Sequence, residues 1–135
     1  LVVHAAGLQG RASTGLDAAA AARVLGAHPL AGSHEGGFAA SRAHLFHACE
    51  VSVEARATDA QRARVERLWR ALGAGRVTYR DADAHDRTMA WVSHLPQLAS
   101  VALAAALEGA SVPASAGGPG LRGATRLAES PLGLW

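Results

Sequence analysis

Hydrophobic and polar residues along the first part of the chain predict strands and helices in turn. Leu1–Val3 is a short apolar run, typical of a buried parallel strand that ends in a loop. The Ala-rich segment 17–25 predicts a helix that Gly26 ends. Residues 48–55 alternate as a strand does, and residues 76–79 form another short strand. This order of elements predicts an α/β sheet.

A capping box marks the start of an amphipathic helix between the last two of these strands. Thr58 is followed three residues later by Gln61, so each side chain can bond the other residue's backbone. Four apolar residues then recur at helical spacing, while arginines fill much of the other surface: Val65, Leu68, Trp69 and Leu72. The pattern predicts a helix that ends at Gly73 and buries these four side chains.

Beyond Asp81 the chain predicts one long helical stretch over residues 83–109, interrupted around Pro96. About 20 apolar residues suffice to span a bilayer, and this stretch is mostly apolar from Thr88 to Leu107. However, polar residues cluster inside it and alanine is only weakly hydrophobic. We therefore predict no membrane span, but a helix buried all round in a bundle or dimer core.

Composition sets limits on the function. The chain has 135 residues, half of them hydrophobic, and 13 basic residues nearly balance 11 acidic ones. All basic residues are arginine, which together with the absence of Lys, Asn and Ile indicates a GC-rich genome, so we predict no nucleic-acid partner. The single cysteine, Cys49, excludes an internal disulfide framework and favours a cytoplasmic location. Because the chain opens inside a strand-like run and stops without a tail, we expect a fragment of a longer protein.

Histidines are the first candidates for chemistry, and there are seven. His44 and His47 have metal-ligand spacing but no acidic or thiolate partner in the pattern of a zinc site, so we predict no metal. His28 precedes Pro29 where a strand should end, which is where open α/β sheets bind ligands. A histidine there can act as a general acid or base, although a structural histidine fits the same pattern.

Two further candidates lie in the second half of the chain. His94 is close to Pro96, so a helix kink could surround it with polar groups, while a core histidine is the plainer interpretation. Arg126 lies in a predicted short helix, residues 121–128, after a glycine-rich loop, and could grip a carboxylate. Arg122 is an equal candidate by composition, and a surface arginine is the alternative for both.

Three motifs follow one another along the chain: HPLAGS at 28–33, HDR and SHLP within 85–96, and GPGLR, TR and SP…W within 118–135. Together they resemble the prephenate/arogenate dehydrogenase family, and the resemblance covers essentially the whole chain. The segment from His28 to Ser33, HPLAGS, is similar to the family's HPMAG(S/T) motif. His85-Asp86-Arg87 followed by SHLP at 93–96 resembles its HDR…SHLP segment. GPGLR at 118–122, Thr125-Arg126 and Ser130-Pro131…Trp135 resemble its GGGFRDTTR and SDPxLW segments.

The resemblance implies a fold and an activity. Residues 1–80 would be the distal part of a Rossmann-like NAD(P)-binding domain, and residues 81–135 the start of an all-helical dimerisation domain. The implied reaction is the NAD- or NADP-dependent oxidative decarboxylation of prephenate to 4-hydroxyphenylpyruvate, or of arogenate to tyrosine. His28 matches the acceptor for the substrate's 4-hydroxyl and Arg126 the cation for a carboxylate. Further matches are substrate-pocket positions (Ser33, His94 and Gln97) and, near the cofactor, Ala6 and Gly7.

The chain also departs from the family's pattern. No GxGxxG follows a strand, so we expect this chain alone to bind the dinucleotide poorly. Gly7 stands where the family often has serine, and the acidic residue of DTTR is absent. Gln97 stands where prephenate-preferring members often carry histidine, which leaves prephenate or arogenate open. A non-catalytic, dimerising remnant that binds an aromatic acid is the alternative, although retention of His28, His94 and Arg126 argues against it.

Overall fold

The computed structural model describes residues 1–10, 12–32 and 37–130. The chain forms two compact units. The first, here called the sheet unit, comprises Leu1–Ala31 and Arg42–Met89. The second, the helical unit, comprises Gly32–Ser41 and Ala90–Trp135. Each is described below by itself.

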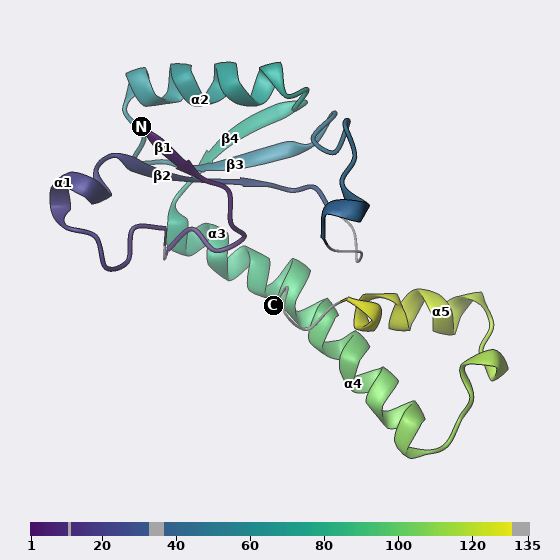
Figure 1. Cartoon of the computed structure of the whole chain (residues 1–135). Helices are drawn as coiled ribbons and strands as arrows, with labels where there is room; N and C mark the ends of the chain where they lie inside the picture. Colours follow the sequence, from purple (N-terminus) through teal and green to yellow (C-terminus); the bar gives the residue numbers. More distant parts are fainter. Residues whose placement is uncertain (11, 33–36, 131–135) are drawn as a thin grey trace. The chain divides into compact units, whose positions relative to one another are not determined.

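Four strands form the centre of the sheet unit, in the order β1-β2-β3-β4 (Figure 1). They are β1 (Val2–His4), β2 (Val24–Pro29), β3 (Glu50–Glu54) and β4 (Arg76–Arg80). β1 pairs with β2 and β3 with β4 in parallel, whereas β2 and β3 are antiparallel. The sheet is therefore mixed, and the predicted α/β class is confirmed. In the antiparallel register His28 lies opposite Ser52.

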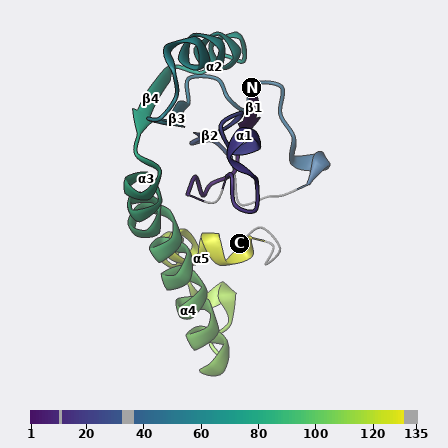
Figure 2. The same cartoon turned by 90° about the vertical axis from the view of Figure 1, so that its left-hand side faces the viewer.

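Helix α2 (Asp59–Ala71) lies along one face of the sheet, as Figures 1 and 2 both show. The predicted capping box between Thr58 and Gln61 is present. Val65 and Trp69 are buried in the core cluster, together with Leu25, Val51 and Val53 of the central strands. Such burial contributes about 1.5–3 kcal/mol for each large apolar side chain.

The prediction that all four apolar residues of α2 face the core is wrong for two of them. Leu68 and Leu72 remain exposed, because a single sheet covers only a narrow stripe of the helix. The end of the helix is as predicted. Gly73 takes φ 90°, a left-handed conformation in which its N–H can reach back to the Arg70 carbonyl.

The predicted helix over residues 17–25 is mostly wrong. Asp17 caps α1, but α1 is only Ala18–Ala21, and Gly26 lies inside β2 instead of ending a helix. The alanines favour a helix locally, but β2 pairs on both sides, with β1 and with β3, and this pairing decides its conformation. The prediction of burial for the first strand also fails, since β1 is an edge strand and Val2 is exposed.

The second half of the chain is helical from Ala82 to Gly109. Helix α3 (Ala82–Met89) completes the sheet unit. The helical unit begins with a π-helical turn (Ala90–His94), followed by α4 (Leu95–Gly109). The interruption near Pro96 is therefore confirmed: proline has no N–H to donate, and it lies in the first turn of α4, where none is required.

Two shorter helical elements pack beside α4 within the helical unit: α5 (Pro119–Thr125) and a 3-10 turn (Arg126–Glu129). Within the chain, α4 is not buried all round as predicted, because only Gln97 and Ser100 are buried along it. Its outer side is apolar, with Trp91 of the preceding turn 71% and Leu98 66% exposed. By length and composition alone the stretch Ala82–Gly109 could cross a membrane, which is weak evidence for one.

Candidate active site

Two histidines from distant parts of the sequence meet in the sheet unit. His28 is the last residue but one of β2, near the strand's end as the sequence predicted, and is half-buried. His85 projects from α3 and is only 1% exposed. Nδ1 of His28 lies 3.1 Å from Nε2 of His85, and the two rings stack edge to face with centroids 5.2 Å apart. This contact fixes the orientation of the His28 ring from one side.

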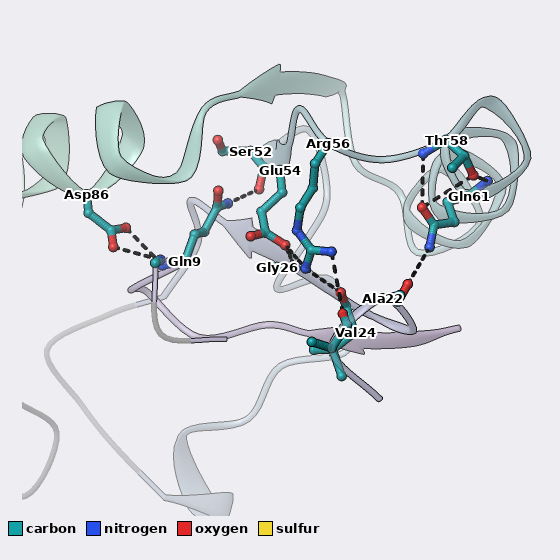
Figure 3. Close-up of polar contacts among 12 residues, drawn as sticks. Gln9, Ala22, Val24, Gly26, Ser52, Glu54, Arg56, Thr58, Gln61 and Asp86 are labelled. Atoms are coloured by element: carbon teal, nitrogen blue, oxygen red, sulfur yellow. Dashed lines mark hydrogen bonds and ion pairs between the residues drawn. The ribbon is translucent and has the colours of Figure 1, made fainter. Parts of the chain in front are cut away.

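Asp86 contacts His85 on the side of the ring opposite His28. Its Oδ1 lies 2.9 Å from Nδ1 of His85. The backbone N–H groups of Gln9 and Gly10 donate to its two oxygens, each at 2.9 Å (Figure 3). Burial raises the pKa of Asp86, but the hydrogen bonds from Gln9, His85 and Gly10 outweigh burial and hold this pKa below its ordinary value. Asp86 is therefore ionised at neutral pH.

The loop after β1 is shaped around this carboxylate. A Cβ on Gly10 would lie 3.0 Å from Oδ2 of Asp86, so the close approach of this backbone favours glycine. The side chain of Gln9 is buried and its Nε2 donates to the Ser52 carbonyl at 2.5 Å (Figure 3). Gln9 thus ties the loop to β3, while its backbone N–H holds Asp86.

Gly7 lies in the same loop, against the other nitrogen of His28. A Cβ on Gly7 would be 3.7 Å from Nε2 of His28. A side chain at this position would therefore contact the imidazole directly. Ala6, the other predicted cofactor-side residue, is exposed.

In the helical unit, the predicted site residue Gln97 has a structural role. Gln97 is buried, and its Nε2 donates to the Leu127 carbonyl at 2.8 Å. Beside it, the hydroxyl of Ser100 accepts a hydrogen bond from the Ala128 N–H at 3.1 Å. These two bonds hold the segment that starts at Arg126 against α4.

The two candidate arginines differ in their contacts. Arg122 donates to the Gly117 carbonyl at 3.1 Å, which closes the glycine-rich loop. Arg126 is exposed, and no carboxylate pairs with it within the part of the chain that the structure describes. Of the two, Arg126 is the better placed to receive an anion.

Comparison with known proteins shows what this arrangement is similar to. Residues 81–135 match the family model described as prephenate dehydrogenase, dimerization domain. Over 99% of its length the chain is similar to the crystal structure of prephenate dehydrogenase from A. aeolicus in complex with hydroxyphenyl propionate and NAD+, at 28% identity and a TM-score of 0.82. The second part of the chain therefore resembles this dimerization domain, and the chain as a whole has the fold of the corresponding part of prephenate dehydrogenase.

A second solved structure has the same fold. The Synechocystis arogenate dehydrogenase superposes with a TM-score of 0.70 at 23% identity, again over 99% of this chain. The chain covers 49% of the A. aeolicus protein and 50% of the Synechocystis protein, so it spans about half the length of these structures. The predicted Rossmann-like sheet followed by part of the dimerisation domain is confirmed.

The turn after β1 does not fit the phosphate of a nicotinamide dinucleotide. There the backbone N–H groups of Gln9 and Gly10 already donate to Asp86. A phosphate needs such N–H groups free, and this turn also lacks the GxGxxG pattern. Gln9 and Gly10 therefore provide no pyrophosphate site, and the expectation that the chain alone binds the dinucleotide poorly stays a prediction.

The predicted site residues are divided between the two units. His28 and Gly7 belong to the sheet unit, whereas His94, Gln97 and Arg126 belong to the helical unit. Their convergence on one cavity stays a prediction, and Ser33 lies outside the described residues. His44 and His47 are exposed, and no group of three metal-ligating side chains occurs in residues 1–10, 12–32 and 37–130.

His85 and Asp86 belong to the HDR motif, but the sequence alone predicts no role for them. Their importance lies in contacts across long sequence separations, 57 residues between His28 and His85 and 77 between Gln9 and Asp86. The available signal was the ionisable pair itself, since titratable residues that become buried need partners.

Proposed function

We propose that this chain supplies the substrate-binding and acid–base residues of an NAD(P)-dependent dehydrogenase. Its substrate would be prephenate, converted to 4-hydroxyphenylpyruvate, or arogenate, converted to tyrosine. The observation that carries the proposal is the ordered series Asp86–His85–His28, which ends in an imidazole at the end of a strand. The A. aeolicus relative, crystallised with hydroxyphenyl propionate and NAD+, supports an aromatic acid and a nicotinamide cofactor.

His28 has one task in this reaction, at the substrate's 4-hydroxyl. As hydride leaves the ring carbon that bears this hydroxyl, positive charge develops there, and an imidazole nitrogen accepting the O–H hydrogen bond stabilises it. The bond to the ring carboxylate then breaks, CO2 leaves, and the electron pair enters the ring, which becomes an aromatic phenol. A nicotinamide cofactor would supply the hydride acceptor.

Arg126 and the polar residues near the helix interruption would hold the substrate. The exposed guanidinium of Arg126 can pair with a carboxylate in two-point fashion. Gln97 holds the Arg126–Glu129 turn through the Leu127 carbonyl, so this residue orients the arginine's segment from behind. We assign His94 and Ser33 to substrate binding, as the resemblance of their motifs implies.

The same proposal includes a homodimer formed through the helical unit. Trp91, Val92, Leu95 and Leu98 expose a continuous apolar surface around the start of α4. Monomeric proteins seldom leave large contiguous apolar patches in water, and such a patch marks an interaction site. The match to a dimerization domain supports a second copy of this chain as the partner.

The decisive experiment assays the complete gene product that carries this sequence. Prephenate and arogenate are each offered with NAD+ and with NADP+, and formation of reduced cofactor is followed by absorbance. His28→Asn is expected to lower kcat by about 10²–10⁴-fold, the usual loss of an acid–base group. His44→Asn, an exposed histidine outside the site, is the matched control and should leave kcat unchanged.

Two results would count against the proposal. An unaltered kcat in His28→Asn would remove the assigned role of the imidazole. Saturable binding of an aromatic acid without turnover of either substrate, with either cofactor, would favour the non-catalytic remnant instead.

A further inference from the structure

The contact between the two histidines admits only one shared proton. Each neutral imidazole has one N–H donor and one acceptor nitrogen, and the nitrogens that face each other here are Nδ1 of His28 and Nε2 of His85, 3.1 Å apart. One must therefore donate and the other accept. Which one donates determines whether the remaining nitrogen of His28 is a donor or an acceptor.

Asp86, on the other side of His85, determines which of the two histidines donates. A carboxylate can only accept, and both its oxygens already receive backbone N–H groups, from Gln9 and Gly10. Nδ1 of His85, 2.9 Å away, must therefore carry a proton. A neutral His85 then has its lone pair on Nε2, so Nδ1 of His28 is the donor in the contact between the rings.

We infer that Asp86 and His85 are positioning residues that hold neutral His28 in its Nδ1–H tautomer, so that Nε2 is the acceptor nitrogen. Nε2 is the atom that faces Gly7, toward the loop after β1. An acceptor at this atom is the form that a hydrogen bond from a substrate hydroxyl requires. Only this catalytic consequence rests on the proposed function; the tautomer itself is a property of the sheet unit.

The tautomer can be measured on this chain directly, without substrate. Long-range proton–nitrogen NMR on protein with ¹⁵N-labelled histidine distinguishes the protonated from the bare ring nitrogen. The spectrum is recorded at pH 8, because the tautomer is a property of the neutral ring. Single His→Gln variants assign the signals, and His28 is expected as Nδ1–H.

His85→Phe tests the origin of that tautomer, because it keeps a buried ring but removes both nitrogens. His28 should then lose its strong preference for Nδ1–H. Asp83→Asn is the matched control: Asp83 lies on the same helix and is exposed, no hydrogen bond or ion pair joins it to His85 among the described residues, and its replacement should leave the His28 signals in place. Should His85→Phe fail to fold, the wild-type spectrum still tests the inference, since an Nε2–H tautomer for His28 would overturn it.

Kinetics on the complete gene product separate positioning from mere support of the fold. His85→Phe is expected to lower kcat by about 10–100-fold, as loss of an orienting partner does, with KM nearly unchanged. The variant could instead lose activity only because less of it folds, with a normal kcat per folded molecule. That result would show that His85 only supports the fold, and it would overturn the positioning role. If the wild-type tautomer is Nδ1–H but neither substrate turns over, the proposed function fails and the tautomer assignment stands.

Discussion

Replacing Asp86 by alanine removes a carboxylate whose two oxygens accept hydrogen bonds from three donors. The donors are the backbone N–H groups of Gln9 and Gly10 and Nδ1 of His85. Gly10 is exposed, so water can reach its N–H group in part, whereas Gln9 is 1% exposed. His85 is 1% exposed, so its N–H is left buried and unpaired.

The size of the effect follows from these surroundings. A buried donor left unpaired costs about 1–3 kcal/mol, and hydrogen bonds to a charged group contribute about 1.5–3 kcal/mol each before solvent replaces them. The Asp86 side chain is 23% exposed, which reduces the contribution of its outer bonds. We therefore expect Asp86→Ala to lower the free energy of unfolding by about 2–4 kcal/mol.

Urea denaturation measures this loss. Tryptophan fluorescence reports on the sheet unit through buried Trp69, and far-UV circular dichroism provides an independent probe. Asp83→Ala on the same helix is the control, expected within about 0.5 kcal/mol of the wild type because Asp83 is exposed. A loss below about 0.5 kcal/mol for Asp86→Ala would refute the account of the site as a supported carboxylate.

The same pair of proteins tests the charge of Asp86 through pH. Its pKa is lowered in the folded state, so its stabilising contribution is complete above the unfolded pKa, about 3.9, and is lost as pH falls through the folded pKa. The stability difference between wild type and Asp86→Ala should therefore narrow at acid pH. A difference that stays constant down to pH 2.5 would mean that the ionised carboxylate is not what the three donors need.

Three further changes test the rest of the molecule. Arg126→Ala should raise KM by about 10–100-fold with a smaller effect on kcat, as expected for the loss of a charge-assisted contact to a substrate carboxylate; an unchanged KM for both substrates, in steady-state assays, would assign that contact to another residue. Leu98→Asp should shift the protein toward monomer in sedimentation equilibrium, because it places a charge in the proposed apolar interface; an unaltered mass would argue against that surface. Thr58→Ala should cost about 1 kcal/mol in urea denaturation by removing the cap of α2, and no loss would contradict the capping box.

The sequence predicts α2 well because its signals are local. The Thr58–Gln61 box and the glycine at position 73 lie within a few residues of the helix ends that they specify. The start of β2 was predicted as helix for the opposite reason. The alanines before it favour a helix, and only pairing with β1 and β3, which no local pattern encodes, makes residues 24–29 a strand.

The candidate site divides in the same way. His28 could be found from the sequence because a histidine before proline at a strand end is a pattern within one segment. His85 and Asp86 could be found only as letters of a motif, because their roles depend on which residues lie opposite them in space. Buried ionisable groups have roles that their partners define, and the partners here lie on β2 and on the loop after β1.

The contacts among these residues form a closed ring, which connects the site to the sheet. Asp86 holds His85, and His85 holds His28 on β2. His28 lies opposite Ser52 in the antiparallel register, and the Ser52 carbonyl accepts from Gln9, whose backbone N–H returns to Asp86. Because these contacts connect the same residues, a shift of the β2–β3 register or of the Gln9 loop would move His28. A substitution of His85 would have the same effect. The imidazole is therefore oriented by the sheet itself, and the proposed role of His28 requires such a fixed orientation, because catalysis tolerates only small displacements of a reacting group.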